Sequence, residues 1–276
     1  TGANIVGDMP APAEVRLKNN SGASKTYANF WLANNDFAST MFHIVEGELR
    51  SSGGTVTSSA SASAGITPGT GQMVRATVVA GSTAVIWSLS ASLLQQTNGN
   101  AFRILGRFLQ ISSTVYATLQ LRSGSARVDS NEVEIKLGST DILQDLGVLT
   151  LPPGGWGVSS YGSVDLYLYL RCAGSATVEL DYLVLLPAEP RLLRHLRVEG
   201  GYAAAANDTI VDDGPEDRRY IDTSVNQYSA VSAEGPALHV VPGVDQRIYI
   251  AHDGTGIDLN STLAVQMFYR PRRRTL

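Results

Sequence analysis

The chain has 276 residues, of which 43% are hydrophobic and 17% charged, so it can bury a substantial core and is not a disordered chain. Its formal net charge of -4 gives no general attraction to nucleic acid phosphates, and its single cysteine, Cys172, excludes an intrachain disulfide and a cysteine-rich zinc module. No apolar run approaches the roughly 20 residues that cross a bilayer, so we expect a soluble protein without membrane insertion.

The N-terminal third predicts an arm followed by short strands. Residues 1–12 are polar and contain Pro10 and Pro12, and residues 14–18 alternate between apolar and polar side chains as a first strand does. Residues 26–34 resemble its partner across a turn at 19–22. A further strand is expected at 42–49, whereas the Ser, Ala, Gly and Thr-rich stretch 51–71 predicts a long exposed loop or edge excursion.

Strand patterns then follow in close succession. They cover residues 73–79, 84–89, 102–111, 115–121, 132–137 and 145–152. Turns rich in Gly, Ser and Asn separate them at 80–82, 97–100 and 122–125. Helix signals are nearly missing. This spacing predicts an all-β fold, an antiparallel β-sandwich of the jelly-roll type.

The most informative segment is residues 163–187. Val164, Leu166, Leu168 and Leu170 alternate with Asp165, Tyr167, Tyr169 and Arg171, so one strand face is apolar and the other is not. A Gly174-containing connection predicts a hairpin into the apolar run 178–186. Tyr167, Tyr169, Asp165 and Arg171, with Trp156 and Tyr161 in the preceding loop, form a candidate face for a glycan or for a protein interface.

We expect three regions. Residues 1–12 form an N-terminal arm, residues 13–190 form the jelly roll, and residues 191–276 form a C-terminal β extension or small second β module that packs on or completes the sandwich. The boundary follows Pro187 and Pro190. In the last region, residues 238–241, 247–251 and 262–269 carry strand patterns, and the chain ends on Arg270, Arg272, Arg273 and Arg274. This basic end predicts an assembly arm that docks on an acidic surface rather than a nucleic acid site.

Motifs for catalysis and cofactors are missing. The sequence has no Gly-x-Ser-x-Gly nucleophile turn, its histidines at 43, 195, 239 and 252 lack metal-ligand spacing, and the acidic turn 212–217 lacks the ligand order of a calcium loop. We therefore expect no enzyme, no metal and no cofactor. Carboxylates for a glycoside hydrolase could come from Glu132, Glu134, Asp165, Glu179 and Asp181, whose mutual distances are unknown at this stage.

Two end segments carry a family resemblance. Residues 4–18, from Asn4 through Gly7, Asp8 and Pro10 to Lys18, resemble the linker and following strand of distal tail and related tail proteins of long-tailed bacteriophages. There the linker introduces a jelly roll similar to galectins and carbohydrate-binding modules. Residues 263–276 resemble the final strand and Tyr-Arg-Pro-Arg ending of phage tail and other virion proteins.

The resemblance implies a non-enzymatic virion structural protein, in the tail, that is soluble before assembly and binds copies of itself and other virion proteins. It also implies a possible host-surface glycan as ligand. The alternatives that stay open are a carbohydrate-binding module for host attachment, a capsid decoration protein, and a polysaccharide hydrolase.

Overall fold

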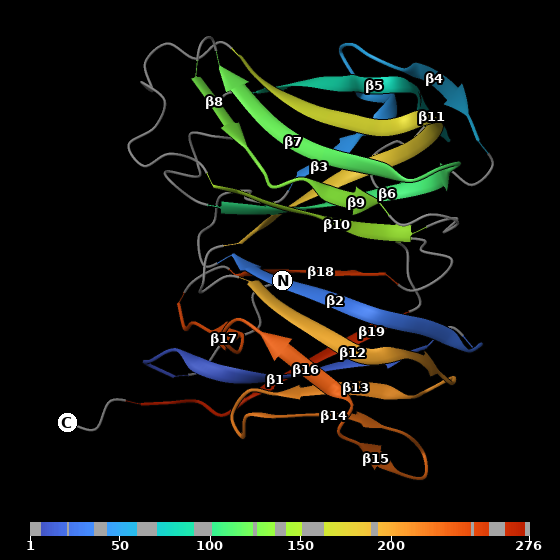
Figure 1. Cartoon of the computed structure of the whole chain (residues 1–276). Coiled ribbons are helices and arrows are strands. Elements are labelled where there is room, and N and C mark those ends of the chain that lie inside the picture. The colour runs from blue at the N-terminus through green and yellow to red at the C-terminus, as the bar shows by residue number, and fades with distance from the viewer. Residues whose placement is uncertain are drawn as a thin grey trace. The chain divides into compact units, whose positions relative to one another are not determined.

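The computed structural model describes residues 7–20, 22–35, 43–59, 71–90, 101–123, 126–135, 142–150, 163–188, 193–243, 246–253 and 263–273. Within these ranges the regular structure is β-strand, apart from the single 3-10 turn η1 (Gly47–Leu49). The strands form antiparallel ladders (Figure 1). The all-β antiparallel sandwich predicted from the sequence is confirmed.

The chain divides into two compact units. Unit 1 contains residues 1–39, 189–255 and 260–276, and unit 2 contains residues 40–188 and 256–259. The expected jelly-roll range 13–190 differs from this division, because residues 13–39 belong with the C-terminal part of the chain. Their strands find their hydrogen-bond partners there rather than in the central region.

Unit 1 is a sandwich of two sheets. The six-stranded sheet runs β15-β14-β13-β1, with β17 and β19 also pairing with β1, and the four-stranded sheet runs β16-β12-β2-β18. The first sheet comprises β1 (Ala11–Asn19), β13 (Thr209–Asp213), β14 (Arg218–Asp222), β15 (Gln227–Tyr228), β17 (His239–Val240) and β19 (Leu263–Tyr269). The second comprises β2 (Lys25–Asn35), β12 (Leu193–Ala204), β16 (Val231–Glu234) and β18 (Arg247–His252).

The core of unit 1 lies between these sheets. Burial alternates strictly along β1, as expected of a strand with one face on a core. Val15 and Leu17 of β1 pack in one cluster with Phe30 and Leu32 of β2 and Leu196 of β12. The strands predicted at 14–18 and 26–34 are therefore present, but the pairing predicted between them is wrong, because β1 and β2 lie in different sheets.

Unit 2 forms one nine-stranded sheet that folds over its own core. Its strands are β3 (His43–Glu46), β4 (Thr55–Ser58), β5 (Gln72–Ser90), β6 (Ala101–Ile111), β7 (Val115–Ser123), β8 (Ala126–Asp129), β9 (Val133–Ile135), β10 (Ile142–Thr150) and β11 (Ser163–Pro187). Residues 51–71 were expected to form a long exposed loop or an edge excursion. Within this range, β4 pairs with β5, and residues 60–70 lie outside the described residues.

Two long strands, β5 and β11, connect the layers of unit 2. Two turns predicted from the sequence are wrong because these strands continue through them. The expected hairpin at Gly174 and the expected turn at 80–82 do not form, because β5 and β11 continue through these segments and pair along both halves. Gly81 lies opposite Cys172, and the register shifts between Cys172 and Ser175. Small residues thus mark a bulge in a continuous ribbon rather than a reversal of the chain.

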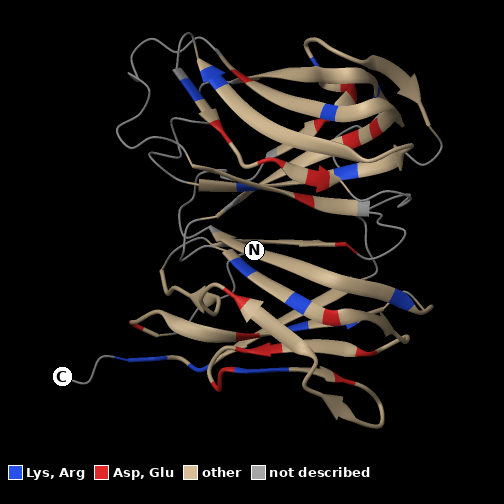
Figure 2. Cartoon of the chain, viewed as in Figure 1, with Lys and Arg blue, Asp and Glu red and all other residues tan. Residues whose placement is uncertain are grey.

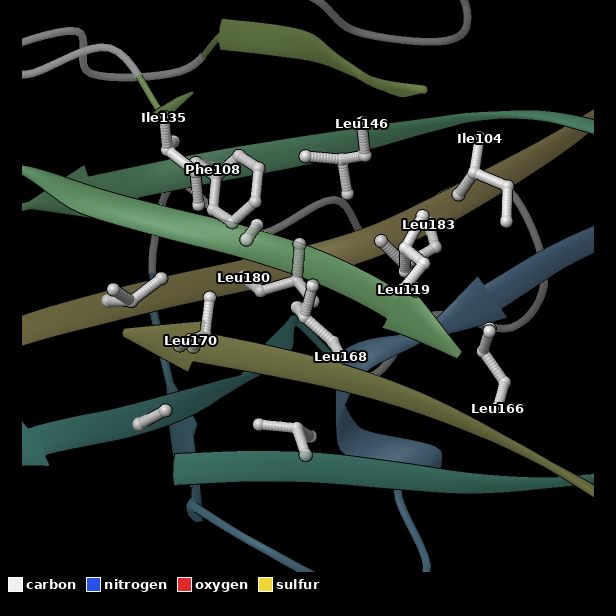
Figure 3. Close-up of a cluster of buried hydrophobic side chains, with 14 of the residues drawn as sticks. Ile104, Phe108, Leu119, Ile135, Leu146, Leu166, Leu168, Leu170, Leu180 and Leu183 are labelled. Carbon is white, nitrogen blue, oxygen red and sulfur yellow. The ribbon is translucent and has the colours of Figure 1, made fainter. Parts of the chain in front are cut away.

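The two halves of β11 serve different layers. Its first half pairs with β7, and its second half pairs with β6 and β3, while β5 accompanies both halves. Leucines from β11 point toward Phe108 of β6, Leu119 of β7 and Ile135 of β9 (Figure 3). This core holds the first half of β11 in place, so that its polar side chains face outward. None of the described residues belongs to a helix that could cross a membrane.

Candidate binding face

The first half of β11 presents the predicted polar face. Val164, Leu166, Leu168 and Leu170 are at most 1% exposed, whereas Asp165, Tyr167 and Tyr169 are half-buried and Arg171 is exposed. The period-two alternation that predicted two faces is confirmed, and its physical cause is the pleat of a strand with one side on the core.

Neighbouring strands extend this face. Asp165, Tyr167, Tyr169 and Arg171 lie opposite Arg122, Gln120, Thr118 and Tyr116 of β7, and on the other side Asp165, Tyr167 and Tyr169 lie opposite Ser88, Ile86 and Ala84 of β5. Gln120 and Arg122 in turn lie opposite Asp129 and Arg127 of β8. Directly opposed residues share a sheet face. We call these outward residues of β5, β7, β8 and β11, together with Glu132, the tyrosine face.

Arg122 organises the centre of the tyrosine face. Its guanidinium carbon lies 4.5 Å from the ring centroid of Tyr167 and 5.8 Å from that of Tyr169. The two rings stack with centroids 5.7 Å apart and an angle of 9° between their planes. Arg122 Nη2 donates to the Tyr169 hydroxyl at 2.8 Å. This cation–π and hydrogen-bond arrangement holds both rings in defined positions.

A chain of polar contacts continues from Arg122 to β8. Its Nε donates to Gln120 Oε1, and Gln120 Nε2 donates to Asp129 Oδ1. Arg127 Nε donates to Asp129 Oδ2 at 2.8 Å. The hydrogen bond from Arg127 lowers the pKa of the Asp129 carboxyl, so this group stays ionised at neutral pH. Figure 2 shows basic and acidic residues side by side on β7 and β8.

The remaining charges are paired at the flanks. Arg171 donates to Glu132 through Nη2 at 2.8 Å and Nε at 3.0 Å, and its guanidinium carbon lies 4.8 Å from the ring centroid of Tyr116. The hydrogen bond from Arg171 lowers the pKa of the Glu132 carboxyl. Asp165 Oδ1 accepts a hydrogen bond from Ser88 Oγ at 2.7 Å.

The arrangement offers aromatic rings and planar polar groups in fixed positions. Its arginines, Arg122, Arg127 and Arg171, lie among the carboxylates Asp129, Glu132 and Asp165, and Glu134 of β9 lies opposite Tyr116 on the same side, so charges of both signs are interspersed. Aromatic and arginine side chains held this way suit the binding of a protein surface or of a polyhydroxylated ligand. Such a face binds through contact area and hydrogen bonds rather than through long-range attraction.

Two residues that the sequence predicted for this face are not among those that the structure describes. Trp156 and Tyr161 lie outside the described residues, so their relation to Tyr167 and Tyr169 stays a prediction. The sequence interpretation did not include Arg122, Gln120 and Tyr116. The alternation of residues 115–122 matches that of 164–171, which was an available signal, but the pairing of β7 with β11 could not be read from it.

Of the carboxylates considered for a hydrolase, Glu132 and Asp165 take part in the contacts given above, and Glu179 and Asp181 are bound by arginines. Arg75 donates to Glu179 at 2.6 Å, and Arg107 forms a buried ion pair with Asp181. Among the described residues, no cluster of three or more histidine, cysteine or carboxylate groups could hold a metal ion. His195 stacks on Trp31, and His252 packs against Tyr27, so both imidazoles take part in packing in unit 1.

The predicted assembly arm begins where β19 ends. Arg270, Arg272 and Arg273 are exposed, whereas Arg274 lies outside the described residues. The arm is anchored by its backbone, since Asp8 N donates to Arg272 O at 2.9 Å and Met9 forms a bridge with Arg272. The basic residues of this segment precede the C-terminal end in Figure 2.

Comparison with known proteins yields distant structural likenesses. No protein-family model matches the sequence, and no curated protein matches it. The carbohydrate-binding module TmCBM61, solved with beta-1,4-galactotriose, shares 9% identity at a TM-score of 0.29 over 53% of this chain and 89% of that chain. The insecticidal crystal protein Cry2Aa shares 13% identity at a TM-score of 0.30 over 55% of this chain and 22% of that chain. Both likenesses are too distant to bear on function.

Proposed function

We propose that this protein is a non-enzymatic structural subunit of a bacteriophage particle, located in the tail, which assembles through its sandwich faces and terminal arms. One observation carries the proposal. The two segments that resemble phage tail proteins lie at opposite ends of the sequence, yet β1 and β19 pair over seven consecutive residue pairs, from Ala13 with Tyr269 to Asn19 with Leu263. Segments that resemble one family and also form one structural element support a common origin.

The position in the particle is tested by labelling. We expect gold-labelled antibody against the purified chain to mark the tail of intact phage particles in electron micrographs. Label on the shell would replace the tail assignment by the capsid decoration alternative. Particles that carry no label, although the chain is produced during infection, would contradict a virion role.

The role of the assembly arm is tested by removing its positive charges while its backbone is kept. Replacing Arg270, Arg272, Arg273 and Arg274 by Gln keeps the backbone contacts of Arg272, so unit 1 should stay folded. We expect incorporation into particles to fall at least severalfold, because the arm loses its attraction to acidic neighbours. Replacing Arg218 and Arg197, two exposed arginines outside the arm, serves as the matched control and should leave incorporation unchanged.

The tyrosine face favours a second candidate function, carbohydrate binding for host attachment. Tyr167 and Tyr169 are half-buried aromatic rings positioned by Arg122 among hydrogen-bonding groups. A glycan array followed by calorimetry would detect saturable binding. We expect Tyr167→Ala with Tyr169→Ala to abolish it, whereas Tyr228→Ala, at an exposed tyrosine of β15, should not. Binding that survives the double substitution would remove this face as the glycan site.

A further inference from the structure

The tyrosine face combines two features of a protein interface. Tyrosine and arginine, which are enriched in such interfaces, make up its centre. Its flanking charges stay accessible even though they are paired, since the side chains of Arg127, Arg171 and Glu132 are 58%, 51% and 43% exposed. A protein partner can therefore reach both the rings and the charges around them.

The residues of this face are ordered in rows that cross the strands. Directly opposed residues on neighbouring strands belong to one row. In order along β11, the rows are Asp165 with Arg122 and Arg127, Tyr167 with Gln120 and Asp129, Tyr169 with Thr118, and Arg171 with Tyr116 and Glu134. On β11 the first row holds an acid and the last row a base. On the β8 and β9 side the order is reversed, with a base in the first row and an acid in the last.

This order makes the face complementary to itself. A two-fold axis in the plane of the contact, crossing the strands between the second and third rows, places each strand antiparallel over its own copy. The first row then meets the last row. Asp165 lies over Arg171 of the second copy, and Arg127 lies over Glu134 of the second copy. Symmetry repeats both pairs, so opposite charges meet at both ends of the contact.

The atoms that the Asp165–Arg171 pair needs are available. Glu132 accepts hydrogen bonds from Nε and Nη2 of Arg171, so Nη1 of this arginine can donate to a second carboxylate. Ser88 donates to Oδ1 of Asp165, so Oδ2 can accept from a second arginine. Charge-assisted hydrogen bonds of this kind are among the stronger ones in proteins.

The aromatic centre is fixed before the contact forms. In the middle rows, Tyr167 lies over Tyr169 of the second copy, and Arg122 holds both rings within each chain. Side chains that are ordered in advance lose little further freedom on association. Stacked sheets pack about 10 Å apart with their strands nearly aligned, which is the geometry that this contact requires.

We propose that two copies of this chain associate through their tyrosine faces about this two-fold axis, with Asp165 and Arg171 as reciprocal ion-pair partners. The inference rests on the proposed assembly function and deepens it by naming the partner and the contact. The two can fail separately, because labelling of particles tests the virion role, whereas the oligomeric state of the purified chain tests the contact. The contact covers Tyr167 and Tyr169, so a dimer of this kind cannot hold a glycan there.

Charge complementation between the two chains tests the proposal with the full protein. Asp165→Lys brings two bases together across the contact, and Arg171→Glu brings two acids together. Each variant alone should therefore have a dissociation constant at least about tenfold above that of the wild type. An equimolar mixture of the two variants should recover the dimer, because opposite charges then meet at both ends. Sedimentation equilibrium over a range of concentrations measures all three dissociation constants.

Two controls make the result decisive. Arg197→Glu, a charge reversal at an exposed residue of β12, should leave the wild-type dissociation constant unchanged, and thermal unfolding checks that both face variants stay folded. A wild-type chain that stays monomeric at all concentrations, with or without glycan bound at Tyr167 and Tyr169, would overturn the proposal. A dimer that ignores the charges at positions 165 and 171, or variants that fail to recover when mixed, would overturn it equally.

Discussion

At the scale of single residues, unit 1 depends on a buried ion pair between its two sheets. Arg194 of β12 donates to Asp212 of β13 through Nε at 2.9 Å and Nη2 at 2.7 Å. The two side chains are 4% and 1% exposed. Asp212 belongs to the acidic cluster that the sequence analysis considered for calcium, and its partner in the structure is an arginine. A buried charge that loses its partner is strongly destabilising.

Asp212→Asn should therefore lower the free energy of unfolding by about 3–5 kcal/mol, because Arg194 stays charged in a buried site. Urea denaturation measures this change. Asp213→Asn is the matched control, because the neighbouring side chain is half-buried, and it should change the free energy by less than about 1 kcal/mol. Equal effects at both positions would contradict a structural role specific to the pair.

His252 makes the stability of unit 1 sensitive to pH. Burial lowers the pKa of its imidazole to about 4, with a further decrease from Lys25 and an opposing increase from Asp253. The unfolded chain binds this proton below about pH 6.5, whereas the folded chain resists it. Stability is therefore fully present above pH 6.5 and is lost progressively as the pH falls toward 4.

The expected loss from His252 is up to about 3 kcal/mol between pH 6.5 and 4. His252→Phe keeps an aromatic ring against Tyr27 but removes the titration, so its unfolding free energy should fall less over the same pH range. Denaturant midpoints of both proteins at several pH values provide the comparison. Parallel curves for the two proteins would exclude His252 as the cause.

At the scale of elements, the long β5–β11 ribbon is supported by a tight segment before β4. Ser51 N donates to Ile86 O at 2.7 Å, and Ile86 N donates to Ser52 O at 2.9 Å. Gly53 then passes so close to β5 that an added Cβ would lie 1.9 Å from Ala84 O, at a φ of +80°. Only glycine fits here, so this contact fixes how the segment docks on the ribbon.

Gly53→Ala should destabilise unit 2 by at least about 3 kcal/mol, because backbone strain and a backbone clash act together. Gly200→Ala is the matched comparison, since Gly200 has a φ of +73° but no atom within 4 Å of its added Cβ. It should cost only about 1 kcal/mol. Chemical denaturation of both variants separates the clash from the conformational term.

At the scale of the whole molecule, unit 1 is built from both ends of the chain. β1 lies between β13 and β19, and β2 lies between β12 and β18. The C-terminal strands of each sheet therefore meet through a strand from the first 39 residues. In contrast, β3 to β11 of unit 2 come from one continuous stretch, residues 43–187.

A fragment of residues 189–276 should therefore show no cooperative unfolding by circular dichroism, because both of its sheets lack a central strand. Adding residues 7–39, joined by a flexible linker, should restore a cooperative transition. A fragment of residues 40–188 should unfold cooperatively without any addition. A stable fold of residues 189–276 alone would show that β1 and β2 are dispensable for unit 1.

A feature of the fold could be predicted from the sequence when it depends only on residues close together in the chain. Alternation in residues 164–171 predicted both the strand and its outward side chains, and the apolar run 178–186 predicted a strand buried on both faces. The turns expected at 80–82 and Gly174 were wrong because each glycine looks like a chain reversal when its cross-strand partner is unknown.

The sequence alone determined the class of fold, the positions of several strands, among them β1, β2, β6 and β7, and the polar face of β11, because side-chain periodicity is set by the local geometry of the backbone. It did not reveal β12, β13 and β14. Only the tertiary structure decided which strands pair. It brought Arg122 and Gln120 to Tyr167 and Tyr169, and it joined β1 to β19. Pairing depends on contacts between residues far apart in the chain, and the local pattern of either strand carries no record of its partner.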